Sequence, residues 1–197
     1  MKILILNETL NLGGAENMVV TLSNTLQSTT GLEISVAASS GEMVERLSKD
    51  IKYYELPSYD ILSSLKIIKI LSYIIGDFYP DIIHTHSATM AVLVYVSIKS
   101  ISSKTKLILT HHSRKFSRLP NRVAVFILNK IVDNFIAISN SKYQEMVHLG
   151  VNKNKIEFIP NFVDIINVNE FCKVRISKRI RKEIGVSDES RIILWAV

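Results

Sequence analysis

A pair of glycines near the start of the chain could bring a phosphate group close to the backbone. Gly13 and Gly14 follow the apolar run 2–6, and Glu16 lies just after them in a segment of helical period. Glycine allows close approach of a ligand, and a helix N-terminus presents free N–H groups and the positive end of its dipole. A phosphate fits this position, and so does a turn that needs glycine for backbone reasons alone.

The glycine pair matches neither of two common phosphate-binding motifs. Gly-x-Gly-x-x-Gly is absent, and no acidic residue ends the second apolar run at residues 37–40, so the sequence does not favour an NAD enzyme. The Gly-Lys-Ser/Thr ending of a P-loop is also absent, so the sequence gives no support for a kinase or an NTPase.

Histidines follow two later apolar runs. His84 and His86 are two residues apart, so strand alternation turns them to the same side, and His111 and His112 follow the run 107–109. Carboxyl ends of parallel strands form the edge where open α/β sheets bind ligands. Four of the five histidines are therefore predicted to gather at this edge, although each could also cap a strand and bond to loop backbone.

The histidines also allow a metal site, which would make the protein a metal-dependent hydrolase. His-x-His can supply two ligands, but no carboxylate or cysteine accompanies the pairs at a familiar ligand spacing. Ser87 and Ser113 are neighbouring hydroxyl groups, yet neither lies in a Gly-x-Ser-x-Gly elbow. The hydrolase is the weaker alternative, and we expect no metal.

The elements that must position these residues alternate along the chain. Short runs rich in β-branched residues are followed by longer segments of helical period, which predicts an α/β fold with a Rossmann-like, doubly wound parallel sheet. The predicted strands are 2–6, 33–38, 52–56, 82–85, 106–110, 134–138 and 156–159, and the predicted helices are 15–27, 42–47, 61–77, 89–101, 121–132 and 141–148. Ser141 is predicted to cap the last helix, with Gln144 at the reciprocal position, and Gly150 to end it with positive φ.

The pattern changes after residue 164. Residues 1–164 are predicted to form one domain, whereas 165–197 contain a polar stretch, the basic segment 173–183, turn residues at 185–190 and a final apolar run. A buried parallel strand needs neighbours to satisfy its backbone groups. Residues 165–197 are therefore predicted to be an interdomain linker and the first strand of a truncated second domain.

Composition and charge restrict the partners. The chain is 47% hydrophobic, too apolar for a disordered protein, and its net charge of +6 favours anionic partners such as phosphates and acidic lipid surfaces. It has no nucleic-acid-binding motif, and its longest apolar region is too interrupted to span a bilayer. The single Cys172 cannot form an internal disulfide and no signal peptide is evident, so we predict a cytoplasmic protein.

Two amphipathic segments could bind an anionic membrane surface from the cytoplasmic side. One is 61–75, with Lys66 and Lys69 among aliphatic residues; each segment could instead be a core-facing helix with a solvated charged face. The second segment, 114–130, is the better candidate because it directly follows the histidines, and its predicted membrane-facing residues are Arg114, Lys115, Arg118 and Arg122.

Five short motifs occur in an order that resembles the N-terminal domain of the family 4 retaining glycosyltransferases. They are Gly-Gly-Ala-Glu at 13–16, Pro-Asp-Ile-Ile-His-Thr-His-Ser at 80–87, Thr-His-His-Ser at 110–113, Ile-Ala-Ile-Ser at 136–139 and Ile-Pro-Asn-Phe-Val-Asp at 159–164. The resemblance covers residues 1–164. Members of that family have two Rossmann-like domains facing a cleft, the GT-B arrangement, and the chain resembles the N-terminal half, which mainly holds the acceptor.

The resemblance implies transfer of a sugar, with retention and without a metal, from a nucleotide-sugar donor to a saccharide or lipid-linked acceptor, in the synthesis of a cell-surface polysaccharide or glycoconjugate. It also implies roles for particular residues. His112 would contact the transferred sugar, as the catalytic residue. The other implied site residues are Gly13, Gly14 and Glu16 in the loop near donor phosphates and acceptor, His84, His86 and Ser87 on the acceptor side, and Ser139 and Asn161 as supporting residues.

The sequence departs from the family pattern in two places. Phe162 stands where the family usually has a glycine, and the second domain's basic residues and its paired-glutamate motif have no counterpart in the chain. The resemblance therefore implies a chain that is catalytically incomplete. It leaves two alternatives to a transferase domain: a non-catalytic acceptor-binding module, or one half of a split enzyme whose C-terminal domain is encoded separately.

Overall fold

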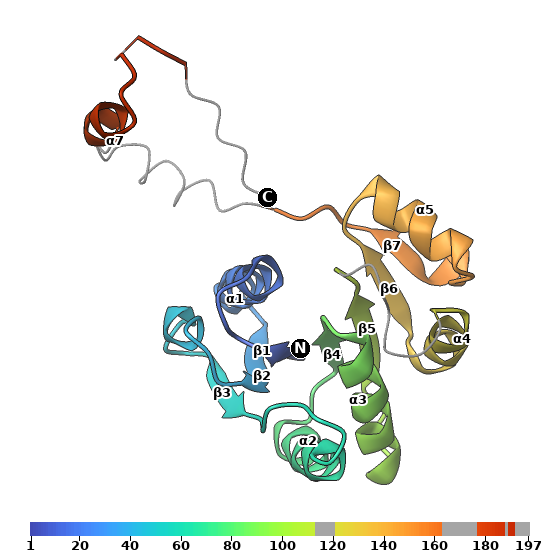
Figure 1. Ribbon diagram of the computed structural model, residues 1–197. Helices are drawn as coiled ribbons and strands as arrows, with labels where there is room; N and C mark the ends of the chain where they lie inside the picture. The colour runs from blue at the N-terminus through green and yellow to red at the C-terminus, as the bar shows by residue number, and fades with distance from the viewer. Residues whose placement is uncertain (113–120, 163–176, 188, 192–197) are drawn as a thin grey trace. The chain divides into compact units, whose positions relative to one another are not determined.

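The computed structural model describes residues 1–112, 121–162, 177–187 and 189–191. The chain divides into two compact units, Met1–Phe162 and Val163–Val197, which are described here separately (Figure 1). The first unit carries the sheet and all of the histidines. In the second unit, the described residues include the short helix α7 (Ser177–Glu183), which is followed by Gly185 in the left-handed region with φ +70°.

The first unit is built on a seven-stranded sheet in which all neighbouring strands are parallel. Its spatial order is β3-β2-β1-β4-β5-β6-β7, so the direction of winding reverses between β1 and β4. The predicted Rossmann-like, doubly wound parallel sheet is therefore confirmed. The strands are β1 (Lys2–Thr9), β2 (Glu33–Ser39), β3 (Lys52–Glu55), β4 (Ile82–Thr85), β5 (Lys106–Thr110), β6 (Asn134–Ala137) and β7 (Ile156–Phe158).

Helices cover both faces of the sheet, but unequally. Crossovers between parallel strands are right-handed. Winding in opposite directions from β1 therefore puts α1 on one face and the later helices on the other, as Figure 1 shows. The helices are α1 (Gly14–Gln27), α2 (Ser64–Phe78), α3 (Ala88–Ser100), α4 (Asn121–Ile131) and α5 (Asn140–His148).

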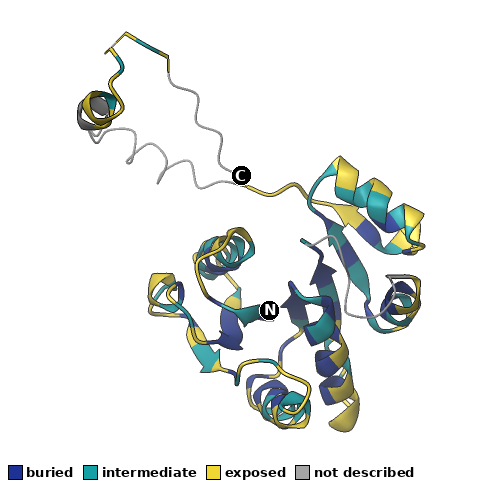
Figure 2. Ribbon diagram, in the orientation of Figure 1, coloured by how far each residue is buried: buried dark blue, intermediate teal, exposed yellow. Residues whose placement is uncertain are grey.

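The core consists of two hydrophobic layers separated by the sheet. Alternate residues of β1 face opposite sides: Leu4 and Leu6 join the layer under α2 and α3, whereas Ile3 and Ile5 join the layer under α1. All four side chains are buried, because a central parallel strand is covered on both faces. Figure 2 shows the resulting pattern, with buried strands and helices exposed on their outer sides.

Two predicted helices differ from the structure by more than one residue. The segment 42–47 forms only a 3₁₀ turn, η1 (Val44–Arg46), because the N–H of Met43 donates to the carbonyl of Leu10 at 2.8 Å and ties this segment to the end of β1. The helix predicted to begin at residue 61 begins at Ser64. A turn precedes it, in which the N–H of Ser63 donates to the Asp60 carboxylate at 2.6 Å.

The start of α5 also differs from the prediction. Ser139, not Ser141, is the N-cap, because Ser139 has an extended backbone at φ −155° and its hydroxyl oxygen accepts the N–H of Lys142 at 3.1 Å. The helix therefore begins at Asn140, separated from β6 only by Ile138 and Ser139. The predicted end is confirmed, since Gly150 has φ +93°.

Candidate functional site

The candidate residues follow three adjacent strands of the sheet. Gly13 comes after β1, His86 after β4 and His112 after β5, and these strands lie in the order β1-β4-β5. Parallel strands that neighbour one another end at the same edge, and in doubly wound sheets this carboxyl edge, next to the reversal of strand order, is where ligands bind. The topology thus brings together residues that are up to about a hundred positions apart in sequence.

Three of the histidines form a connected chain of rings. The His84 and His86 rings are 4.5 Å apart between centroids, which confirms that strand alternation turns them to the same side. His84 Nε2 lies 2.7 Å from the hydroxyl oxygen of Thr110, and His86 Nδ1 lies 2.9 Å from Nε2 of His112. The His86 and His112 rings are stacked at 5.2 Å.

Burial keeps these imidazoles neutral at physiological pH. Burial, and then the charge of His112, lowers the pKa of His84 to about 4, and burial with its two histidine neighbours lowers the pKa of His86 well below its usual value. The pKa of His112 is also lowered, by burial first and by Lys142 second. Each ring then carries one N–H donor and one nitrogen acceptor, so the cluster can recognise hydroxyl groups but carries no charge.

The hydrogen bonds favour one arrangement of protons in this chain. Nε2 of His86 is buried and has no hydrogen-bond partner. A buried N–H without an acceptor is rarer in proteins than an unused acceptor, so the proton of His86 belongs on Nδ1, where it is donated to His112. His112 Nε2 then accepts, which puts the proton of His112 on Nδ1, on the far side of its ring.

The fourth histidine of the predicted group has different neighbours. His111 is buried, and Lys142 and Glu145 of α5 are the charged side chains outside the cluster that act on its pKa, which burial lowers to about 4. The side chains of successive residues after β5 point to opposite faces of the sheet, so His111 and His112 lie on different faces. The candidate site therefore uses His112 and not His111.

The glycine pair does not need glycine for its backbone conformation. Gly13 is extended, with φ −174°, and Gly14 is the first residue of α1. A turn that demands glycine for backbone reasons is therefore not the explanation. A Cβ on Gly13 would collide with the carboxylate of Glu16, whereas one on Gly14 would meet nothing within 4 Å. Both glycines are exposed and no side chain caps α1, so its first N–H groups are open to a ligand.

Ser87 joins the ends of two strands. Its hydroxyl oxygen accepts the N–H of Met90 at 3.3 Å, which makes Ser87 the N-cap of α3, and its hydroxyl donates to the carboxylate of Glu8 on β1. Sequence analysis did not identify Glu8 as a site residue. The available signal was its position just after the first apolar run and before the glycine pair.

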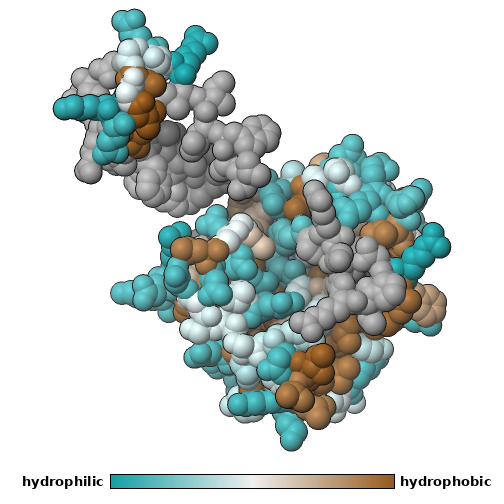
Figure 3. Space-filling view, in the orientation of Figure 1, coloured by the Kyte–Doolittle hydropathy of each residue, from teal (hydrophilic) through white to brown (hydrophobic). Residues whose placement is uncertain are grey.

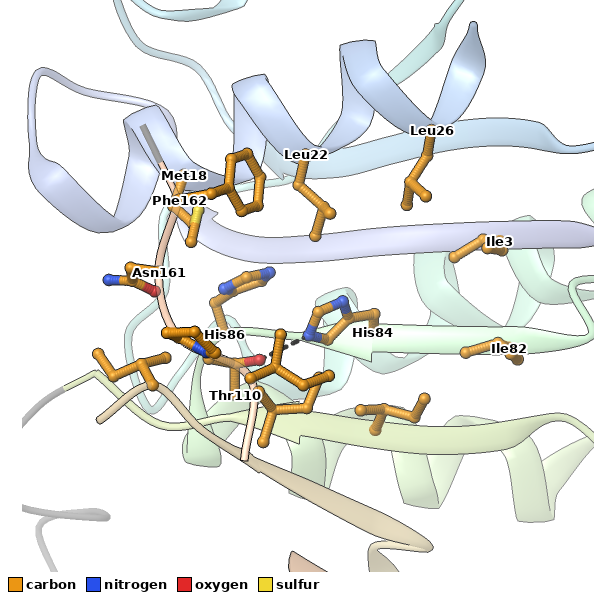
Figure 4. A pocket seen from close by; sticks show the side chains of 15 residues that line it. Ile3, Met18, Leu22, Leu26, Ile82, His84, His86, Thr110, Asn161 and Phe162 are labelled. Atoms are coloured by element: carbon orange, nitrogen blue, oxygen red, sulfur yellow. Dashed lines mark hydrogen bonds between the residues drawn. The ribbon is translucent and has the colours of Figure 1, made fainter. Parts of the chain in front are cut away.

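A groove opens on the same side of the sheet as α1, with a volume of about 170 Å³ (Figure 4). His84, His86 and Thr110 lie at the end of the groove near Asn161 and Phe162. Met18 of α1 lies beside Phe162 at this same end, and further apolar side chains line the groove, including Leu22 and Leu26 of α1, Ile3, Ile82, Ile108 and Ile136. The groove is therefore mainly apolar, and its few polar residues lie at the carboxyl edge, the end that we call polar, beside Met18 and Phe162.

The remaining predicted residues have diverse positions. Ser139 caps α5, Asn161 is exposed at the polar end of the groove, and Phe162 is 42% exposed. Phe162 is not among the described residues with positive φ, so it does not strain the turn in which the family usually has glycine. Of the predicted membrane-facing residues, Arg122 lies exposed on α4, and the others, like Ser113, lie outside the described residues.

Within the described ranges, no group of three or more His, Cys, Asp or Glu side chains is arranged to hold a metal ion. A search of the same residues for a helix long and apolar enough to cross a bilayer also found none.

The strand order and the histidines at the carboxyl edge define a doubly wound α/β domain with a candidate site next to the reversal of strand order. The model of the family Glycosyltransferase Family 4 matches residues 12–166, and the chain therefore belongs to that family. No curated protein matches the sequence.

Solved structures show the same fold at low sequence identity. HepE from Anabaena in complex with UDP-glucose has 20% identity to this chain and a TM-score of 0.73, and the match covers 95% of this chain and 50% of HepE. A glycosyltransferase from Rickettsia africae has 20% identity and a TM-score of 0.74, and the match covers 98% of this chain and 54% of that enzyme. The UDP-GlcNAc 2-epimerase of Neisseria meningitidis bound to UDP-GlcNAc has 15% identity and a TM-score of 0.66, and the match covers 97% of this chain and 55% of the epimerase. The chain thus spans about half the length of these structures, and its fold is that of the N-terminal half of the GT-B arrangement.

Proposed function

We propose that the chain is the acceptor-side domain of a glycosyltransferase that moves a sugar, with retention, from a nucleotide-sugar to a saccharide or lipid-linked acceptor. The observation that carries this proposal is the chain of neutral rings from His84 through His86 to His112 at the carboxyl edge, next to the strand that leads into the open glycine pair. The family match and the structural neighbours with bound UDP-sugars support it.

In this proposal the residues orient the reactants. The open N–H groups at Gly13 and Gly14 hold a donor phosphate, and the Nδ1–H of His112 donates to a hydroxyl group of the transferred sugar. His112 is neutral and its Nε2 is occupied by His86, so it acts as a hydrogen-bond donor and not as a nucleophile. The donor's own phosphate helps to deprotonate the acceptor hydroxyl, and no metal is required.

The polar end of the groove suggests how an acceptor would be held. The polar end, with His84, His86 and Asn161, suits saccharide hydroxyl groups, and Ser87 and Glu8 close the edge between β4 and β1. Ser139 has a supporting role, since it fixes the start of α5 next to β6. An acceptor destined for a cell-surface polysaccharide or glycoconjugate would be met in the cytoplasm, at the inner face of the membrane.

The second domain of the arrangement is part of the proposal. We infer that donor binding is completed by a C-terminal domain, in the same polypeptide or encoded separately, because the matched structures are about twice as long as this chain. Without that domain, the chain would act as an acceptor-binding module.

A fusion protein tests the proposed activity. The chain is joined to the C-terminal half of the Rickettsia africae glycosyltransferase, and release of nucleoside diphosphate is measured with a panel of nucleotide-sugars and a lipid-linked saccharide extract. We expect turnover of at least one donor and a loss of about a hundredfold in His112→Ala, the usual effect of removing a positioned donor. A fusion that binds a donor but neither transfers nor hydrolyses it would contradict the proposal.

A further inference from the structure

The start of α2 exposes three large aliphatic side chains to solvent. Leu62 is 93% exposed, Leu65 74% and Ile61 71%. Scattered apolar residues are normal on a protein surface, but three large ones within five positions form a local apolar patch. Figure 3 shows hydrophobic side chains gathered over the segment that leads into α2, in the lower part of the view.

The apolar patch continues into a basic stripe along the outer side of α2. Lys66, Lys69 and Tyr73 follow Leu62 and Leu65 at helical spacing, and all three are exposed. The inner side of the same helix packs into the core through Ile67, Leu71, Ile74, Ile75 and Phe78. The core therefore accounts for one side of α2 and leaves the apolar and basic residues of the other side unexplained.

Along α2 itself, no acidic side chain lies near these lysines. The first acidic residue along α2 is Asp77, which is at the other end of the helix and pairs with Lys52 at 3.1 Å. Asp60 precedes the helix, and its carboxylate accepts the N–H of Ser63. Within the part of the chain that the structure describes, neither Lys66 nor Lys69 forms an ion pair.

A hydrogen-bonded turn fixes the position of the aliphatic residues. The hydroxyl of Ser63 accepts the N–H of Asp60 at 2.9 Å and donates to the carbonyl of Ser58 at 3.0 Å, which closes the loop around Ile61 and Leu62. Because α2 connects β3 to the parallel strand β4, it runs opposite to the strands and begins at their carboxyl edge. The patch therefore lies at the edge of the sheet that carries the histidines.

We propose that residues Ile61, Leu62, Leu65, Lys66, Lys69 and Tyr73, which we name the α2 surface, bind the interface of an anionic lipid bilayer. The aliphatic side chains enter the boundary between headgroups and acyl chains, and the lysines contact the anionic headgroups. A partner protein could bury the same leucines, but the adjacent unpaired lysines favour a negatively charged surface. Binding would turn the carboxyl edge toward the membrane. The use of that orientation for sugar transfer rests on the proposed function, whereas membrane binding itself does not.

Vesicle co-sedimentation of the chain tests this surface without any catalytic assay. The probes are vesicles of phosphatidylcholine alone and vesicles with roughly a third of phosphatidylglycerol, a range in which charge attraction is substantial. One variant is Leu62→Gln with Leu65→Gln, and the other is Lys66→Gln with Lys69→Gln. Because these side chains are exposed, both variants should fold, which circular dichroism checks.

Matched controls make the same chemical changes elsewhere. Val92→Gln with Val96→Gln removes exposed aliphatic residues from α3, and Lys104→Gln with Lys153→Gln removes the same charge as the lysine variant. We expect the unmodified chain and both controls to bind the anionic vesicles and not the neutral ones. Each α2 variant should bind the anionic vesicles at least tenfold more weakly, since each lysine near such a surface contributes about a fivefold factor.

Two results would overturn the proposal. One is an unmodified chain that does not bind anionic vesicles, or α2 variants that bind them as tightly as it does. The other is an oligomer that dissociates in the leucine variant while vesicle binding is unchanged, measured by light scattering, which would make the patch an interface between copies of the chain. Neither result would bear on sugar transfer, which the fusion protein tests.

Discussion

Replacing His84 with glutamine should reduce the loss of stability that the protein suffers as the pH falls below neutrality. His84 is buried and its pKa is lowered to about 4, whereas an unfolded histidine has a pKa near 6.5. The folded state therefore binds fewer protons than the unfolded state between these pH values. Stability from this group is fully present above pH 6.5 and is lost as the pH falls through 4.

The magnitude follows from the two pKa values. At pH 5 the unfolded histidine is almost fully protonated and the folded one is not, so His84 alone removes about 2 kcal/mol from the free energy of unfolding relative to pH 7.5. This is a large share of the roughly 5–15 kcal/mol that stabilises a domain. In His84→Gln the amide can still reach the hydroxyl of Thr110, but it does not titrate.

Urea denaturation at pH 7.5 and at pH 5.0, followed by circular dichroism, gives the two free energies of unfolding for each protein. The difference between the two pH values should be about 2 kcal/mol smaller in His84→Gln than in the unmodified chain. His148→Gln makes the same replacement at a histidine on the exposed end of α5 and serves as the control for the loss of an imidazole. An equal pH dependence in His84→Gln and in the unmodified chain would refute the assignment of a buried, neutral His84.

Three further predictions concern the site and the membrane. Gly14→Ala should keep or slightly raise the melting temperature, because the added Cβ meets nothing within 4 Å, but weaken nucleotide-sugar binding measured by calorimetry; unchanged binding would remove the phosphate role. His86→Phe should release the ring of His112, so that its imidazole ¹⁵N shifts change from a single Nδ1–H form to a mixture of tautomers; an unchanged spectrum would contradict the proton arrangement. The last prediction concerns four basic residues, Arg114, Lys115, Arg118 and Arg122. Replacing all four with glutamine should weaken binding to anionic vesicles at least tenfold, and unaltered binding would exclude them from the membrane contact.

The fold could be predicted from the sequence because its signals are local. Most strands are short apolar runs, and most of these runs are followed by a helical segment, so the alternation alone indicated a parallel sheet. The end of β1 was harder to predict. The polar residues Asn7, Glu8 and Thr9 extend the strand past Leu6, and its pairing with β2 shifts register there, which no local sequence pattern indicates.

The contacts within the site could be predicted only in part. The spacing of His84 and His86 fixes their common side, and that much was correct. The bond between His86 and His112 depends on the register between β4 and β5. The contact between Ser87 and Glu8 likewise depends on β4 pairing with β1, across a sequence separation of 79 residues. Such contacts follow from strand order, which residue patterns do not specify.

The central claim is that the glycine pair and the histidine chain together receive a phosphorylated sugar. NMR spectra of the fusion protein described above, with ¹⁵N in the residues of this chain, test it directly when the protein is titrated with uridine, guanosine, adenosine and thymidine diphosphate sugars. At least one of these donors should shift the amide signals of Gly13 and Gly14 and the imidazole signal of His112 at the same concentration, while His148 stays in place. If every donor leaves these three groups unchanged, or shifts only residues away from the carboxyl edge, the site does not bind the proposed ligand.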